Sequence, residues 1–443
     1  MSLKSQIDIK RKLASYCLIY QNEMKPISVN FRELVKDLDK NERYTHQIHP
    51  YPAKLLTQIP YYFLYTDALC PKDGIVLDPF CGTGTVLLEA VLSGRNALGA
   101  DANPLASLIS RVKTNYIPKA DLQETLKKVL QRVNDTNVAT SYPDAVSAWY
   151  SPRTLPQLSA LQESIEMIED EKKKTFFELC FSSVVRKVSY ADPSISVPVH
   201  WNPKRFINNP KKMYEVESRL KSLESIDVFD RFEAVCQTNI DMIETLNGKI
   251  RSGVSAKIIS DDARSLGLES NSVDMILTSP PYAGAQKYIR ASWLSLYWLK
   301  LVELNEIKCL KRRNIGREDY KKSEIYECYT SIPSADEVLS IIYKKGKKDR
   351  AFLAANYLNE MKIALDEACR VLKVGGYMVI VIGNNTVCGQ VFDTQSYLTT
   401  YLEGNGMQLQ FKLIDDIKSY GLMTRRNKTA NMITREWILV FKK

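Results

Sequence analysis

The stretch GIVLDPFCGTGTVLLEAVLSG, residues 74–94, constrains the fold of this chain more than any other. Its first apolar residues predict a buried strand over residues 75–77, and the apolar run after Gly84 predicts a helix that ends at Gly94. Between them, Gly82 and Gly84 allow the backbone to turn tightly and to approach a ligand closely. A strand that leads through a glycine loop into a helix is typical of a mostly parallel α/β sheet.

Six further strand candidates follow, so we expect a seven-stranded, doubly wound α/β sheet. The second candidate ends at Asp101 and the third near Asp262, while the fourth and fifth cover residues 273–277 and 377–382. A Gly-Gly turn is expected just before the fifth. The last two candidates, MQLQFKLIDD and REWILVFKK, predict a closing antiparallel pair.

The chain between the second and third strands is too long for an ordinary crossover. Residues 116–254 contain charged helical patterns, and we interpret them as an inserted, mainly helical subdomain. The expected organisation is therefore an N-terminal extension (1–45), a first part of the sheet domain (46–115), the insert (116–254) and a second part (255–443), with a basic insert near 306–350.

Composition restricts the class of protein and its partners. The 443 residues are 45% hydrophobic and 25% charged, as in a soluble globular protein, and no apolar run has the length of a membrane span. The net charge of +10 suits a polyanionic partner, although it is explained equally well by solubility. Nine cysteines without a CxxC pair, and three histidines, predict neither a disulfide framework nor a metal site. We read no signal or transit peptide and expect a cytoplasmic protein of undetermined oligomeric state.

Asp101 adds a second ligand signal to the glycine loop. It lies about twenty residues beyond the loop, at the tip of the second strand, where a carboxylate can accept hydrogen bonds from both hydroxyls of a ribose. Together the two features predict an adenosine-containing cofactor. Leu87 stands where the dinucleotide fingerprint has its third glycine, which disfavours NAD and FAD.

The fourth strand ends in TSPPY, residues 278–282. Pro281 makes the turn stiff and holds Pro280 extended, so that carbonyl groups project from it. The Ser279 hydroxyl and the Pro280 carbonyl are two acceptors, and Tyr282 is a flat surface for stacking. Such a group suits the exocyclic amino group of a nucleobase, because two acceptors can hold its hydrogens while its lone pair localises for attack.

TSPPY and DPFCGTG together resemble the S-adenosylmethionine-dependent DNA amino-methyltransferases. In that family Ser before Pro-Pro is usual for the N4-cytosine type, whereas Asp or Asn is usual for the N6-adenine type. The stretches HQIHPYPAKLLTQIPYYF, WYSPRTLPQL, SYADPSISVPV and KRRNIGRE are also similar to segments of these enzymes, so the resemblance covers roughly residues 44–443. Many N4-cytosine enzymes carry SPPY before the glycine loop, whereas here the loop comes first.

The resemblance implies a Rossmann-like methyltransferase domain, S-adenosylmethionine as cofactor, and double-stranded DNA with a flipped-out cytosine as substrate. It also implies a restriction-modification or related system, with a cognate restriction endonuclease as a further partner. The residues implied at the cofactor are Tyr51, Lys54, Asp78, Phe80, Gly82, Gly84, Asp101, Asp262 and Ala263. The catalytic turn would consist of Ser279, Pro280, Pro281 and Tyr282, with Tyr282 stacked on the base.

Basic side chains after the turn, near residue 311 and in GLMTRRNKTANM are candidates for DNA contact, although solvated charge runs are the ordinary interpretation. These are Arg290, Lys311, Arg312, Arg313, Arg317, Arg425 and Arg426. The aromatic residues Tyr288, Trp293 and Tyr297 have roughly helical spacing, and we interpret them as core.

Three alternatives stay open at this point. They are N6-adenine methylation on the same scaffold, an RNA amino-methyltransferase, for example one acting on guanine N2, and a non-catalytic DNA-binding subunit that keeps the fold. Methylation at cytosine C5 is disfavoured because its nucleophilic cysteine typically follows a proline, and the chain has no Pro-Cys dipeptide.

Overall fold

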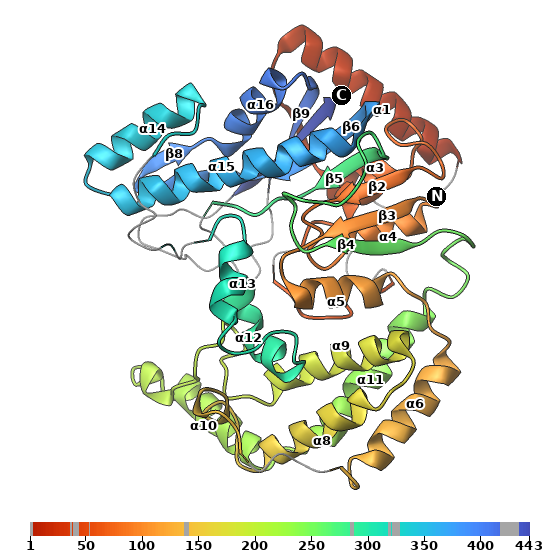
Figure 1. The fold of residues 1–443 in the computed structure, drawn as a ribbon, viewed down its shortest axis with the longest axis vertical. Coiled ribbons are helices and arrows are strands. Elements are labelled where there is room, and N and C mark those ends of the chain that lie inside the picture. Colours follow the sequence, from red (N-terminus) through yellow and green to blue (C-terminus); the bar gives the residue numbers. More distant parts are fainter. Residues whose placement is uncertain are drawn as a thin grey trace.

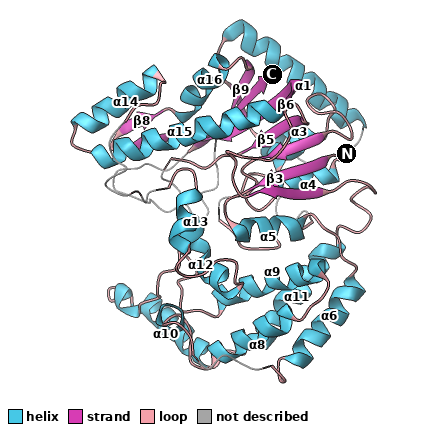
Figure 2. Ribbon diagram, in the orientation of Figure 1, coloured by secondary structure: helices cyan, strands magenta, loops and turns pink. Residues whose placement is uncertain are grey.

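The computed structural model describes residues 3–35, 38, 44–52, 54–136, 141–283, 288–317, 320, 328–416 and 434–443. Its centre is an eight-stranded sheet in the order β1-β9-β10-β6-β5-β2-β3-β4 (Figures 1 and 2). The strands are β1 (Ile27–Val29), β2 (Ile75–Asp78), β3 (Asn96–Ala100), β4 (Ala256–Ser260), β5 (Val273–Thr278), β6 (Leu372–Ile382), β9 (Gln408–Asp416) and β10 (Arg435–Lys442). A separate hairpin pairs β7 (Asn385–Val387) with β8 (Gln390–Phe392).

The α/β class and all seven expected strands are confirmed, but the sheet has an eighth strand. β1 lies at the edge and pairs parallel with β9, from Ile27 opposite Leu413 to Val29 opposite Asp415. Its three residues are too few to show an alternating pattern, so the sequence gives no signal for it. The closing pair is also confirmed, because β10 runs antiparallel to both β6 and β9.

β6 differs from its prediction at its beginning. It starts at Leu372 and continues through Gly375 and Gly376, where we expected a turn. Gly375 has a φ of +80°, and the pairing of β5 with β6 shifts between Val273 and Met275. The glycines therefore produce an irregularity within the strand rather than a turn before it.

Helices cover both faces of the sheet, which explains the continuous apolar runs of its central strands. In β5, Met275 and Leu277 belong to one apolar cluster and Ile276 to the cluster on the opposite face. The first face carries α1 (Leu3–Glu23), α2 (Phe31–Leu34), α3 (Gln58–Leu64) and α4 (Thr85–Leu92). The second face carries α14 (Pro333–Lys344), α15 (Lys348–Val371) and α16 (Thr394–Gly404).

A helical layer lies beside the sheet, below it in Figure 1, with its own apolar cluster. Between β3 and β4 in the sequence come α5 (Pro104–Lys113), α6 (Lys119–Arg132), α7 (Asp144–Ser147), α8 (Thr154–Glu166), α9 (Glu171–Lys187), the 3₁₀ helix η1 (Pro203–Phe206), α10 (Pro210–Glu224) and α11 (Val228–Glu244). α12 (Tyr288–Trp298) and α13 (Ile307–Arg313) follow β5 and join the same cluster. Through the described ranges, no helix is both long and apolar enough to cross a membrane.

The strand order fixes where a ligand can bind. The chain runs from β2 outward to β3 and β4, and then returns to form β5 on the other side of β2. Open α/β sheets bind their ligands at such a switch point, outside the carboxyl ends of the strands.

Candidate active site

A cavity opens at this switch point and brings the two sequence motifs together. Its empty space, including its open mouth, is about 700 Å³. Four strand ends supply its walls, because residues that follow β2, β3, β4 and β5 all contribute. The lining residues are Tyr51, Pro79, Phe80, Gly82, Asp101, Ala102, Asp262, Ala263, Ser279, Pro281, Tyr288, Arg313, Asn314 and Ile315.

The glycine loop is shaped for close approach. Gly82 and Gly84 have φ values of +49° and +74°, which side chains with a Cβ rarely adopt. A Cβ on Gly84 would lie 2.8 Å from the Ser110 hydroxyl oxygen, so a larger residue would push α4 away from α5. The Ser110 hydroxyl in turn donates to the Gly82 carbonyl over 2.8 Å. Gly84 therefore serves packing, whereas Gly82 is at the cavity wall.

Asp101 is held in place by backbone donors. Its two carboxylate oxygens accept from the Gly82 N–H at 2.9 Å and from the Asn103 N–H at 2.8 Å. Burial raises the pKa of Asp101 to about 6, although these two hydrogen bonds lower it. Each carboxylate oxygen has a second lone pair, so the fixed carboxylate can still accept from the hydroxyls of a ribose. The loop and Asp101 fit an adenosyl cofactor.

Asp78 connects the glycine loop to the Ser-Pro turn and does not line the cavity. One of its carboxylate oxygens accepts from the Thr278 hydroxyl at 2.6 Å and from the Phe80 N–H at 3.1 Å. β2 and β5 are neighbours, so these bonds hold their two carboxyl ends together. Burial raises the pKa of Asp78 to about 7, against the lowering effect of both hydrogen bonds.

Asp78→Asn should therefore change how stability depends on pH. The folded pKa is above the unfolded value, so the contribution of Asp78 is fully present below about pH 4 and is lost as pH rises through 7. The amide keeps an acceptor for Thr278 and Phe80 but has no charge to bury. We expect the free energy of unfolding of the variant, relative to wild type, to increase by as much as roughly 4 kcal/mol between pH 4 and pH 8. Urea unfolding at several pH values measures it, and a pH-independent difference would contradict this view of Asp78.

Two tyrosine rings form part of the cavity wall. Tyr51 and Tyr288 are parallel within 5°, with ring centroids 6.4 Å apart. The Tyr51 hydroxyl accepts from the side-chain amide of Asn103 at 2.8 Å, and that amide also donates to Ser292 at 3.1 Å. The helical spacing of Tyr288 predicts a core residue, but Tyr288 lines the cavity. Its position at the start of the first described helix after the turn is the signal that could have identified it.

Lys54 lies outside the cavity lining, unlike Tyr51 from the same segment. Its amino group donates to the carbonyls of His46 at 3.2 Å and of His49 at 2.7 Å, and burial lowers its pKa to about 8. His46 contacts Glu89 of α4 at 2.8 Å, and His49 contacts Ser182 of α9 at 2.8 Å. The segment is thereby fixed between the sheet domain and the helical layer, and Lys54 closes its turn.

Ser279 and Pro281 of the turn line the cavity, whereas Tyr282 and Pro280, which stands between those two residues, are not among the lining residues. The Tyr282 ring packs against the apolar cluster of α14–α16, and its hydroxyl donates to Glu436 of β10 at 3.2 Å. Burial raises the pKa of both groups. Sequence reasoning missed Glu436, because a glutamate in a closing strand carries no local signal for such a contact.

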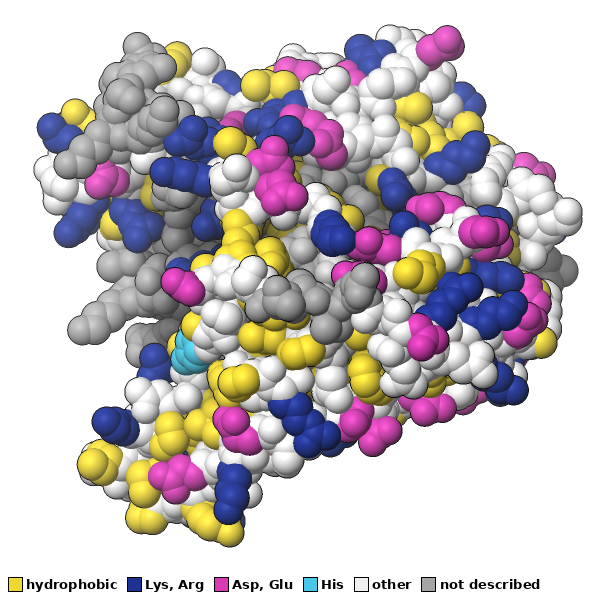
Figure 3. Space-filling model, turned by 60° about the horizontal axis from the view of Figure 1, so that its bottom comes forward, with side chains coloured by type: hydrophobic (Ala, Val, Ile, Leu, Met, Phe, Trp, Pro, Cys, Tyr) yellow, Lys and Arg dark blue, Asp and Glu magenta, His cyan; other side chains and the backbone are white. Residues whose placement is uncertain are grey.

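The basic candidates are in three different situations. Arg313 lines the cavity and pairs with Asp261 at 2.8 Å, while Arg317 lies 3.7 Å from Glu360. Arg290 is exposed on α12, and Lys311 and Arg312 are partly exposed on α13. Arg425 and Arg426 lie outside the described residues. On the face shown in Figure 3, Lys and Arg form several groups with Asp and Glu between them.

Comparison with known proteins identifies the family. The model of the N6/N4 DNA methylases matches residues 8–111 and 273–443, which is more than half of the chain. The chain belongs to the N6/N4 DNA methylase family. Members of this family are S-adenosylmethionine-dependent DNA amino-methyltransferases, so the chain is a DNA methyltransferase with S-adenosylmethionine as its cofactor.

Two curated relatives match this chain over most of their own length. The Type II methyltransferase M.MvaI of Kocuria varians is 26% identical over 80% of this chain and 82% of its own length. M.BsoBI of Geobacillus stearothermophilus is 22% identical over 82% of this chain and 77% of its own length. Among solved structures, an S-adenosylmethionine-dependent methyltransferase of Methanosarcina mazei is 10% identical with a TM-score of 0.29, over 85% of this chain and 94% of that one.

Proposed function

We propose that this DNA methyltransferase transfers the methyl group of S-adenosylmethionine to the exocyclic N4 of a cytosine flipped out of double-stranded DNA. One observation carries the proposal: Ser279 and Pro281 line the same cavity as Gly82 and Asp101. A serine before Pro-Pro favours cytosine over adenine, as in the resemblance above. The base leaves the duplex because a stacked base hides its amino group from the methyl donor.

In the proposed mechanism the chain orients two partners and uses no covalent intermediate. Asp101 and the Gly82 backbone hold the adenosyl part, and the sulfonium supplies the methyl group. The Ser279 hydroxyl and the Pro280 carbonyl accept the two hydrogens of the amino group, which lets its lone pair point at the methyl carbon. Holding the amino nitrogen close to the methyl donor in this orientation replaces a bimolecular encounter in solution. The surplus proton of the methylated amino group leaves to water.

Tyr51, Phe80 and Tyr288 supply aromatic surfaces of this cavity. Tyr282 is not among the residues that line this cavity, its hydroxyl is held by Glu436 and its ring packs in the apolar cluster, so we assign Tyr282 to fixing the turn. The stacking of Tyr282 on the base stays a prediction from the family resemblance. A ring fixed on one side keeps the orientation of Ser279 and Pro280 constant during turnover.

The remaining parts of the proposal concern DNA. We assign the cofactor and Ser-Pro halves to residues 46–115 and 255–443, and sequence reading to the helical insert 116–254 and the basic segment near residue 311. The curated relatives are named as Type II methyltransferases, which supports a place in a restriction-modification system with a cognate endonuclease.

Product analysis tests the proposal. The protein is incubated with S-adenosylmethionine and mixed-sequence DNA, and the DNA is then digested to nucleosides. We expect N4-methylcytosine, and single-molecule sequencing should place it within one short sequence. N6-methyladenine as the sole product would establish the alternative amino group, whereas methylation of tRNA but not of DNA would establish an RNA enzyme.

A further inference from the structure

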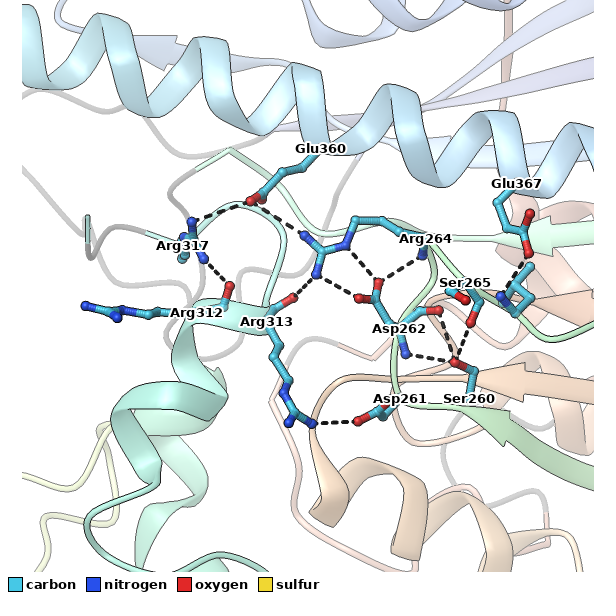
Figure 4. A network of polar contacts seen from close by, with 11 residues as sticks. Ser260, Asp261, Asp262, Arg264, Ser265, Arg312, Arg313, Arg317, Glu360 and Glu367 are labelled. Carbon is cyan, nitrogen blue, oxygen red and sulfur yellow. Dashed lines mark hydrogen bonds and ion pairs between the residues drawn. The ribbon is translucent and has the colours of Figure 1, made fainter. Parts of the chain in front are cut away.

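Two segments that line the cavity meet beside α15. The β4 loop (residues 260–265) supplies Asp262 and Ala263, and the α13 end (residues 312–317) supplies Arg313, Asn314 and Ile315. Figure 4 shows that polar contacts join these two segments to each other and to Glu360 of α15. No motif of the sequence points to Glu360.

Arg264 is the first connection between the segments. Its guanidinium donates to both carboxylate oxygens of Asp262, each over 2.8 Å, and also to the carbonyl of Arg313 over 3.1 Å. The side chain of Arg313 returns to the β4 loop and pairs with Asp261 at 2.8 Å. Burial alone would raise the pKa of Asp262, but its hydrogen bonds with Arg264 lower it below the usual range, so this carboxylate is held ionised.

Glu360 is the second connection, and it reaches both segments at once. One carboxylate oxygen lies 3.7 Å from Arg264 of the β4 loop and 3.7 Å from Arg317 of the α13 end. Glu360 is 9% exposed, so water screens these pairs little. Burial raises the pKa of Glu360, opposed chiefly by Arg317 and Arg264. Arg317 also donates to the carbonyl of Arg312, and its guanidinium lies 4.2 Å from the centre of the Tyr320 ring.

The α13 end also touches the Ser-Pro turn. Gly316 has a φ of +77°, and a Cβ there would lie 3.0 Å from the carbonyl oxygen of Tyr282. The segment is therefore tightly packed between the turn and Tyr357 of α15, whose ring a Cβ on Gly316 would approach to 3.4 Å. Loss of its anchor on α15 would disturb the cavity on the side that faces Asp262 and Ala263.

We propose that Glu360 is a positioning residue, which holds the β4 loop and the α13 end together through Arg264 and Arg317 and so maintains the cavity wall around Asp262 and Ala263. The inference rests on the proposed function, because it takes that wall to be where the adenosyl part of the cofactor binds. Glu360 touches no reacting atom in this account. It acts on cofactor affinity through the two arginines.

The test is Glu360→Gln, with Glu367→Gln as its matched control. Gln keeps the size of the side chain but removes the charge between two arginines. Glu367 lies on the same helix, pairs with Arg370 at 2.7 Å and accepts from the Leu266 N–H at 2.9 Å. Its Gln variant loses the ion pair but keeps an acceptor for Leu266, so it is matched to E360Q in the loss of charge. Calorimetry should show the Kd for S-adenosylmethionine raised about tenfold in E360Q and unchanged in E367Q. With saturating cofactor, kcat should change much less than KM for the cofactor.

A second readout is independent of activity. Amide hydrogen exchange of residues 312–317 should be faster in E360Q than in wild type and E367Q, because their anchor is lost. Arg317→Met should raise the Kd for S-adenosylmethionine by a similar factor. The E360Q/R317M double variant should lose less binding free energy for the cofactor than the sum of the losses of the two single variants. If E360Q does not fold, the same measurements on R317M, with E367Q as the control, test the proposal.

Equal cofactor affinity in wild type, E360Q and R317M would overturn the role of Glu360 and leave the proposed function intact. A wild-type protein that binds no S-adenosylmethionine would overturn both. If the loss of cofactor binding free energy in the double variant equals the sum of the two single losses, Glu360 and Arg317 act separately, and the proposal is rejected.

Discussion

Ser279→Ala is expected to lower kcat by about 10²- to 10³-fold, the cost of removing one preorganised hydrogen-bond partner of a transition state. Ser279 lines the cavity at the carboxyl end of β5, while the adenosyl part of the cofactor is assigned to the walls after β2, β3 and β4. The Kd for S-adenosylmethionine should therefore change little. Single-turnover methylation of DNA measures the rate, and calorimetry measures the affinity.

Ser272→Ala is the matched control for this experiment. Ser272 directly precedes the same strand at its opposite end, and its hydroxyl bonds to the carbonyl of Glu269. The S272A variant should methylate DNA at the wild-type rate. If the rate of S279A equals that of S272A, the proposed hold on the amino group is wrong, whatever the product of the enzyme.

Asp101→Ala should have its effect on the cofactor instead. The substitution removes the carboxylate proposed to bind the ribose and, with it, the acceptor that fixes the Gly82 and Asn103 N–H groups. Hydrogen bonds to a charged group are worth about 1.5–3 kcal/mol, so we expect the Kd for S-adenosylmethionine to rise by about one to two orders of magnitude. Duplex DNA should bind as it does to wild type.

Asp67→Ala is a suitable control, because Asp67 is an exposed carboxylate that pairs with Lys10 and does not line the cavity. Asp101→Asn refines the test, since it keeps one acceptor and should show an intermediate loss. A D101A protein that binds the cofactor as tightly as D67A would place the ribose elsewhere.

The sheet could be predicted because its strands carry strong local signals. β5 is apolar throughout because both of its faces are covered, and β2 is followed at once by Gly82 and Gly84. β1 could not be predicted, since three residues carry no period and their pairing with β9 depends on a segment almost four hundred residues away. The predicted turn at Gly375 and Gly376 is wrong for a related reason. Two glycines favour a turn locally, but pairing with β5 keeps this segment within β6.

The candidate site also contains residues that the sequence could predict and residues that it could not. Gly82, Asp101, Ser279 and Pro281 stand where strands end, so the topology of the sheet brings them to one cavity. Tyr288 and the contact of Tyr282 with Glu436 depend on how distant helices and strands pack, which no local pattern encodes. A motif also does not show which of its members point inward. Lys54 and Asp78 hold the backbone around the cavity, but neither lines it.

The most direct test of the account is a crystal structure with S-adenosylhomocysteine and a duplex that contains the target sequence. We predict the adenosyl group between Asp101 and Ala263, its sulfur facing the Ser-Pro turn, and an extruded cytosine with its amino group against Ser279 and the Pro280 carbonyl. A cofactor bound outside the cavity, or an extruded base far from Ser279, would contradict the central claim that both ligands share this one site.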